Sequence, residues 1–165
     1  MVQAKFHSRF DATSRRYCYK LFCQPLRDPL RERFHWRIWP ETNVEALVKA
    51  APLFLGTHDF SAFGSPTTPR GSTVRTVTKA EWTQARQDEW HFEVQADAFL
   101  YRMVRRLVFV QVAVAQGKVS AEAIAYSLVK PAAAGSRSKS LSLGAGLAPA
   151  HGLTLVEVTY AWTAK

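Results

Sequence analysis

The stretch Ala96-Asp-Ala-Phe-Leu-Tyr-Arg-Met-Val-Arg-Arg-Leu-Val108 changes its periodicity partway along, and this change decides how the chain folds. The segment before it, Trp90-His-Phe-Glu-Val-Gln95, alternates apolar and polar residues as a half-buried strand does. Further along, apolar residues recur at helical spacing, at Met103, Leu107, Val110 and Val114. We therefore predict a strand that leads directly into a helix.

Arg105 and Arg106 follow Arg102 by three and four residues, so the three arginines would share one face of the predicted helix. Such a basic face can bind an anionic partner, and it can equally be a plain solvated surface. The stretch by itself does not distinguish the two interpretations.

More strands are predicted on both sides of this stretch. Residues 73–85 alternate and are separated from the strand at 90–96 by Gln87-Asp-Glu89, so the two would form an antiparallel hairpin. Alternation at residues 15–23 and 153–162 predicts two further strands. Since these strands are mixed with helices and include an antiparallel pair, the predicted class is α+β.

Two more helices are predicted from their end signals. Thr42-Asn-Val-Glu45 matches a capping box with Thr42 as the N-cap, and Pro52 would kink this helix or shorten it to a turn. Another helix would begin at Ser120 and end before Pro131. Residues 131–152, rich in Ala, Ser and Gly, are predicted to be a mobile loop.

The composition predicts one basic domain. A chain of 165 residues with 47% hydrophobic content can bury one core, so we expect residues 1–165 to be a single domain or one half of a larger one. A formal charge of +9, from 22 Lys+Arg and 13 Asp+Glu, favours a polyanionic partner over a generic basic surface.

Other functional classes receive no support from the residue pattern. Cys18 and Cys23 would face opposite sides of a strand, which predicts neither a disulfide nor a metal pair and fits a reducing cytoplasm. No leader and no apolar run of about 20 residues is present, so we expect a cytoplasmic protein with no membrane contact. The histidines lack metal-ligand spacing, which predicts no metal site: His7, His35, His58, His91 and His151.

The strand at 15–23 would carry different side chains on its two faces. Tyr17 and Tyr19 would share one face, and Arg16 and Lys20 the other. Tyrosine rings beside arginines can stack an unpaired base and hold its phosphate, although tyrosines on strands also commonly pack in cores.

Four stretches, in order, resemble the tRNA pseudouridine synthase A (TruA) family. They are Phe6-His-Ser-Arg-Phe-Asp-Ala-Thr-Ser-Arg-Arg-Tyr-Cys-Tyr19, Leu55-Gly-Thr-His-Asp-Phe-Ser-Ala-Phe63, Ala96 to Val108 as quoted above, and Ala148-Pro-Ala-His-Gly-Leu-Thr-Leu-Val-Glu-Val158. The resemblance covers nearly the whole chain. It implies a mixed, largely antiparallel sheet with helices on one face.

The resemblance also implies an activity, namely the isomerisation of uridine to pseudouridine in the anticodon stem-loop of tRNA. No cofactor and no metal would take part, and the protein would be a homodimer. By motif, Tyr17 would stack on the base and Arg105 would pair with the nucleophilic aspartate of the family. The remaining basic residues that we expect to bind RNA are Arg9, Arg15, Arg16, Lys20, Arg102 and Arg106.

The chain departs from the family at the nucleophile. The family's Gly-Arg-Thr-Asp segment is absent, and Asp97, at the end of the predicted strand, is a poor substitute, because the family does not use that position as nucleophile. Two smaller departures are Cys18, which replaces a basic residue, and Phe109, which replaces a small one. We therefore expect the C-terminal half of such an enzyme, inactive by itself, whose N-terminal half is missing or is a separate chain.

Two alternatives stay open at this stage. The chain could be a non-catalytic basic module that binds RNA, since the arginines and tyrosines suffice for that role. It could also be a decayed remnant that exposes an unpaired sheet edge.

Overall fold

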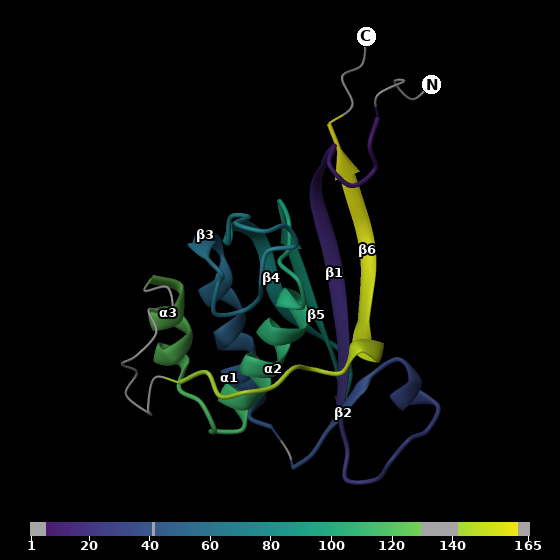
Figure 1. Ribbon diagram of the computed structural model, residues 1–165. Coiled ribbons are helices and arrows are strands. Elements are labelled where there is room, and N and C mark those ends of the chain that lie inside the picture. Colours follow the sequence, from purple (N-terminus) through teal and green to yellow (C-terminus); the bar gives the residue numbers. More distant parts are fainter. Residues whose placement is uncertain (1–5, 41, 130–141, 162–165) are drawn as a thin grey trace.

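The computed structural model of the chain describes residues 6–40, 42–129 and 142–161 (Figure 1). Within these ranges, six strands form one sheet, with the order β2-β1-β5-β4-β3 and with β6 paired to β1. The β1–β2 pair is parallel and the other four pairs are antiparallel. The strands are β1 (Ala12–Cys23), β2 (Trp36–Ile38), β3 (Gly56–Asp59), β4 (Val74–Arg86), β5 (Glu89–Ala96) and β6 (Leu153–Tyr160). The predicted α+β class, with a largely antiparallel sheet, is confirmed.

Three helices, α1 (Val44–Ala50), α2 (Met103–Ala115) and α3 (Ala121–Val129), are grouped together on one side of the sheet (Figure 1). The core lies between them and the strands, and a buried hydrogen bond crosses it from Trp82 Nε1 on β4 to Gln111 Oε1 on α2, at 2.7 Å. No helix in the described part of the chain is long and apolar enough to cross a bilayer.

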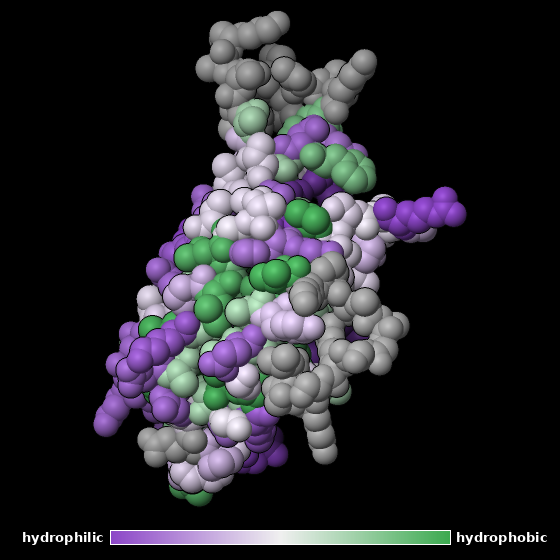
Figure 2. Space-filling model, turned by 90° about the vertical axis from the view of Figure 1, so that its left-hand side faces the viewer, coloured by the Kyte–Doolittle hydropathy of each residue, from purple (hydrophilic) through white to green (hydrophobic). Residues whose placement is uncertain are grey.

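The flank on which α3 and β3 lie is a patchwork of hydrophobic and hydrophilic surface (Figure 2). Large hydrophobic side chains are exposed at several described positions, among them Val48, Leu55, Val74, Tyr101 and Val129. The basic residues of the chain are therefore not gathered into one continuous face on this flank.

The predicted strands and helices are largely confirmed, with one shift at the start of α1. The N-cap is Asn43 and not Thr42, because Asn43 has an extended backbone and its Oδ1 accepts the N–H of Ala46 at 3.0 Å. The Thr42 hydroxyl instead turns back to the carbonyl oxygen of Pro40 at 3.5 Å. Pro52 lies in a short 3₁₀ turn, Ala51–Phe54, as one of the two expected outcomes.

Two short strands, β2 and β3, were not predicted. β2 has three residues and pairs in parallel with the end of β1, and β3 has four residues and pairs with the start of β4. Segments this short are too brief to show alternation, and their strand conformation depends on a neighbouring strand. Cys18 and Cys23 lie on opposite faces of β1 and are not joined in a disulfide, as predicted.

The predicted change from strand to helix is also confirmed, but six residues separate β5 from α2. Arg102 is the N-cap of α2 and has φ 63°, a left-handed conformation that non-glycine residues rarely adopt. Its side chain turns over the ring of Tyr101, with Cζ 4.8 Å from the ring centroid. The expectation that Arg102 lies on a helix face together with Arg105 and Arg106 is therefore wrong.

Of the predicted loop at 131–152, residues 131–141 lie outside the described part. The remainder, residues 142–152, crosses α2 and reaches β6 (Figure 1). It is hydrogen-bonded to α2, since the N–H of Ala148 donates to the carbonyl oxygen of Arg105 at 3.2 Å.

Candidate functional site

The alternation of β1 sorts the predicted site residues onto two faces of the sheet. In the pairing of β1 with β5, Tyr17 lies opposite Val94 and Tyr19 opposite Phe92, and both partners are fully buried under the helices. Arg15, Tyr17 and Tyr19 therefore face the helical side. Since successive side chains of a strand point to opposite faces, Arg16 and Lys20 face the other side.

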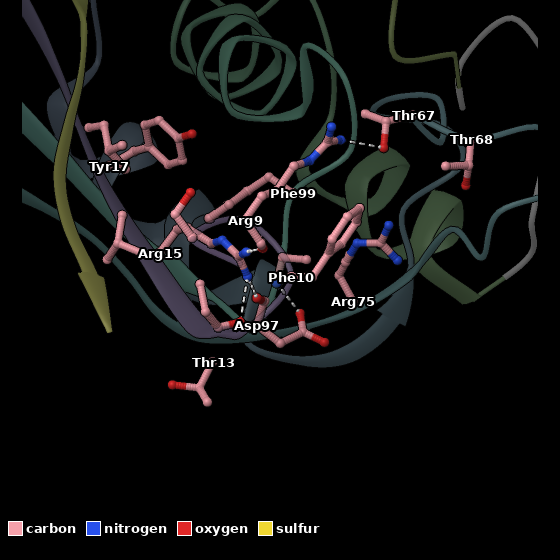
Figure 3. A pocket seen from close by; sticks show the side chains of 15 residues that line it. Arg9, Phe10, Thr13, Arg15, Tyr17, Thr67, Thr68, Arg75, Asp97 and Phe99 are labelled. Carbon is pink, nitrogen blue, oxygen red and sulfur yellow. Dashed lines mark hydrogen bonds between the residues drawn. The ribbon is translucent and has the colours of Figure 1, made fainter. Parts of the chain in front are cut away.

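A hollow of about 700 Å³ lies beside Tyr17 on the helical side (Figure 3). The ring of Tyr17 meets the ring of Phe99 edge-on, with centroids 5.1 Å apart. Three arginines also line the hollow: Arg9 before β1, Arg15 on β1 and Arg75 on β4. The site thus combines flat aromatic rings with cationic hydrogen-bond donors.

The arginines of the hollow are held by neighbouring backbone and hydroxyl groups. Arg15 Nη1 donates to the carbonyl oxygens of Ala12, at 2.9 Å, and Asp97, at 2.7 Å, and its Nη2 donates to the carbonyl oxygen of Arg9. Arg9 Nη2 donates to the hydroxyl of Thr67 at 3.0 Å. These bonds orient the two guanidinium groups without neutralising them.

Arg75 was not among the residues predicted from the sequence. Its Nη1 donates to the carbonyl oxygen of Val74 at 2.5 Å, and its Nε is buried without a hydrogen-bond partner in the described residues. No motif marked this position, and the only available signal was a basic residue within a predicted strand.

The one carboxylate that lines the hollow, Asp97, is engaged with the backbone. Its Oδ1 accepts the N–H of Thr76 at 3.0 Å and the N–H of Ala98 at 2.7 Å. Those bonds give Asp97 a structural role at the end of β5. With three arginines and one carboxylate among its lining residues, the hollow has a net positive charge.

Arg105, on α2, does not line this hollow. It lies beside Tyr19, which follows Tyr17 by two residues on the same face of β1. Arg105 Nε donates to the carbonyl oxygen of Ala148 at 2.6 Å, and the Tyr19 hydroxyl donates to the next carbonyl oxygen, that of Pro149, at 2.8 Å. Burial raises the pKa of Tyr19, and the positive charge of Arg105 partly opposes that rise. Within the described residues, Arg105 has no carboxylate partner in any ion pair.

Arg102 and Arg106 line a separate hollow of about 390 Å³. The guanidinium group of Arg106 donates to the carbonyl oxygens of Gly144, at 2.5 Å, and Gly146, at 2.9 Å, so it fastens this part of the chain to α2. Burial lowers the pKa of Arg106. Phe109 packs at the same place, because a Cβ on Gly146 would come within 2.3 Å of its ring.

On the opposite face of the sheet, Arg16 is paired with two glutamates. Its guanidinium lies 3.3 Å from Glu93 and 3.0 Å from Glu157. Lys79 also contacts Glu93, at 2.7 Å, and the pKa of Glu93 is lowered chiefly by that hydrogen bond and further by Arg16. Of the predicted site residues, the structure thus brings Arg9 and Arg15 together with Tyr17 at one hollow and Arg102 together with Arg106 at another. It places Arg16, Lys20 and Arg105 elsewhere.

Comparisons with known proteins agree with the motifs. Residues 50–161 match the family model described as tRNA pseudouridine synthase. Curated relatives named tRNA pseudouridine synthase A include those of Thermoanaerobacter sp. (strain X514), 33% identical over 159 residues, and Shouchella clausii, 37% identical over 160 residues. Another, from Solidesulfovibrio magneticus, is 39% identical over 166 residues.

These matches cover nearly all of the chain but not all of the relatives. They take in 96%, 97% and 97% of this chain and 62%, 58% and 57% of the three relatives, respectively. The chain therefore spans about three fifths of the length of the curated relatives that it matches. The family model, the relatives and the four motifs lead to one conclusion: the chain belongs to the tRNA pseudouridine synthase A family.

Proposed function

We propose that this chain is the C-terminal portion of a tRNA pseudouridine synthase and that it contributes Tyr17 and Arg105 to the active site. The nucleophilic aspartate would come from an N-terminal portion that carries the Gly-Arg-Thr-Asp segment. The reaction would break the bond between N1 of uracil and the ribose and form a bond from C5 to the same ribose carbon, while C5 loses its proton and N1 gains one. It is an isomerisation, so it needs no redox cofactor.

The observation that carries this proposal is the environment of Arg105. A half-buried guanidinium without a carboxylate partner in the described residues can accept one from another segment. Its Nε is occupied by the carbonyl oxygen of Ala148, which leaves the two terminal nitrogens to bind a carboxylate. An arginine in that position favours the ionised and therefore nucleophilic form of an aspartate.

The hollow beside Tyr17 would bind the RNA strand that carries the target uridine. Tyr17 would stack on a base that is flipped out of the stem-loop, and Arg9, Arg15 and Arg75 would bind the flanking phosphates. Thr67, at the rim, would add a hydroxyl donor. Arg9 and Arg15 were already expected to bind RNA from the sequence, and Arg75 is added to them here.

The other basic residues would contribute less to RNA binding. Lys20 and Arg102 would make outer phosphate contacts. Arg16 and Arg106 already bind glutamates and backbone carbonyls, respectively, so an RNA phosphate would have to compete with these partners. A homodimer in the cytoplasm stays part of the proposal, and sedimentation of the purified protein tests its dimeric state.

Reconstitution tests the division of the active site. The chain would be assayed alone, and then together with the N-terminal two fifths of the Shouchella clausii relative, for pseudouridine formation on an anticodon stem-loop. We expect no turnover by the chain alone and measurable turnover by the pair. Turnover by the chain alone would refute the proposal.

The role of Arg105 needs a matched control in the reconstituted pair. Arg105→Ala is expected to lower kcat by a factor of at least about 100, the lower end of the range for losing an electrostatic contact in an active site. The control Arg33→Ala removes an exposed arginine in the 3₁₀ turn between β1 and β2 and should leave the rate unchanged. If the chain binds the stem-loop but no N-terminal portion restores turnover, it is a non-catalytic RNA-binding module instead.

A further inference from the structure

A second cluster of titratable side chains lies on the face of the sheet opposite Tyr17. His35 lies between a 3₁₀ turn (Arg31–Arg33) and β2, while Glu89 and His91 are two residues apart on β5 and so share a face. One nitrogen or oxygen atom of each side chain lies within 4.8 Å of the other two. Glu89 is buried and the two histidines are partly buried.

The hydrogen bonds of His35 show which of its ring nitrogens carries a proton. Nδ1 lies 3.1 Å from the carbonyl oxygen of Arg31, and because a carbonyl only accepts, Nδ1 must donate. The other nitrogen, Nε2, is buried, lies 3.2 Å from Glu89 Oε1 and has no other hydrogen-bond partner in the described residues. With Nδ1 as the donor to Arg31, this contact is favourable when a cation lies between Nε2 and Oε1, which is either a proton on Nε2 or a bound metal ion.

The carboxylate of Glu89 is held so that one of its oxygens faces both imidazole rings. Arg31 Nη2 donates to Oε2 of Glu89 at 3.1 Å, which leaves Oε1 to face both imidazoles, with His91 Nε2 at 2.8 Å. Asp88 binds Nη1 of Arg31 at 2.7 Å and offsets its charge. Carboxylate and carbonyl groups that hold the ligands from behind are typical of metal sites in proteins.

We propose that His35 Nε2, Glu89 Oε1 and His91 Nε2 bind a divalent transition metal ion, with Zn²⁺ as the first candidate. Two imidazoles and one carboxylate form a zinc ligand set that leaves a fourth position for water. Ligand atoms around a tetrahedral Zn²⁺ ion are about 3.3 Å apart, given metal–ligand bonds of about 2.0 Å. The distances of 2.8 and 3.2 Å from Glu89 Oε1 to the two nitrogens need only small adjustments to reach that value.

The neighbouring charges set limits on this site. Lys20 lies opposite His91 in the β1–β5 register, and Arg86 Nε lies 4.0 Å from Glu89 Oε2. Their positive charges would weaken cation binding, so a moderate affinity is expected. Binding also requires Nε2 of His91 to carry no proton, because a ligand nitrogen must offer its lone pair to the metal.

The site would act as a clamp. It would join the connection between β1 and β2 to β5. His35 and Glu89 are 54 residues apart in the sequence, so the spacing of residues along the chain did not predict the site. The expectation of no metal site came from that spacing. The site is independent of the proposed reaction, which takes place on the other face of the sheet.

Isothermal titration of the metal-stripped full chain with Zn²⁺ tests the proposal. One site is expected, with Mg²⁺ giving no heat, because Mg²⁺ prefers oxygen ligands. His35→Ala and His91→Ala should each raise Kd by at least about tenfold, the lower end of the range for losing even a supporting partner. The control His58→Ala removes a histidine on β3 that binds the carbonyl oxygen of Leu55 and should leave Kd unchanged.

A second measurement guards against misfolded variants. Zn²⁺ should raise the melting temperature of the unsubstituted chain and of His58→Ala, but not that of Glu89→Gln, whose fold is checked by circular dichroism in EDTA. Unchanged Kd in both ligand variants, or no binding to the unsubstituted chain at millimolar Zn²⁺, would overturn the proposal. His35 would then be a charged imidazolium paired with Glu89, and ¹⁵N spectra would show protons on both of its ring nitrogens.

Discussion

Replacement of Arg75 by glutamine should weaken tRNA binding in a way that depends on salt. Arg75 lines the positive hollow with Arg9 and Arg15, and no carboxylate neutralises it among the described residues. If it binds a phosphate, the substitution removes one contact that releases counterions. Arg16→Gln is the matched control, because the charge of Arg16 is already balanced by two glutamates.

The expected size follows from counterion release. Each phosphate contact contributes about 0.7 to 0.9 to the slope of log K against log salt concentration. Between about 50 and 200 mM salt, the logarithm of the concentration changes by about 0.6. The factor by which affinity falls over this range should therefore be about three times smaller for Arg75→Gln than for the unsubstituted chain. Arg16→Gln should change the slope much less.

Fluorescence anisotropy with a labelled anticodon stem-loop, at several salt concentrations, measures both slopes. Thermal melts of each variant confirm that it is folded. Equal slopes for Arg75→Gln and the unsubstituted chain would refute the assignment of Arg75. A larger effect of Arg16→Gln would move the RNA to the opposite face of the sheet.

Two further substitutions test the fold itself. Gln111→Leu leaves the buried indole N–H of Trp82 without an acceptor and should destabilise the protein by about 1–3 kcal/mol, seen as a melting temperature lower by roughly 3–9 °C; an unchanged melting temperature would contradict this. Lys79→Met tests the depressed pKa of Glu93: a carboxyl whose folded pKa is lowered from 4.5 contributes stability above that value and loses it as the pH falls through the folded pKa. Urea unfolding should therefore show a larger difference between the variant and the unsubstituted chain at pH 7 than at about pH 3, and equal differences would refute the role of Lys79.

The elements that could be predicted from the sequence are those that carry their own periodicity. β4 and β5 alternate over most of their length, and α2 repeats its apolar residues over three turns, so local pattern and tertiary packing agree. β2 and β3 have three and four residues and depend on hydrogen bonds to neighbouring strands. Such strands leave no signal in a single sequence.

In the candidate site, too, only the features that follow from local periodicity could be predicted from the sequence. Tyr17 and Tyr19 share one face of β1, with Arg16 and Lys20 on the other, as predicted, because strand alternation is a local property. The engagement of Arg106 by residues 143–146 depends on a segment without periodicity crossing α2, so it could not be foreseen. Arg75 was missed for a related reason: the strand that carries it reaches the hollow only through the order of strands in the sheet.

In strand β1, the parity of a residue's number decides which face of the sheet its side chain points to. Odd-numbered residues such as Arg15, Tyr17 and Tyr19 face the proposed reaction, and even-numbered ones such as Arg16 and Phe22 face the ion pairs and the histidine cluster. Inserting or deleting one residue within β1 would exchange the two sets beyond that point. Single substitutions can therefore change one side chain of β1 at a time. A change of one residue in the length of the strand would instead alter both the face of the proposed reaction and the face that carries the ion pairs and the histidine cluster.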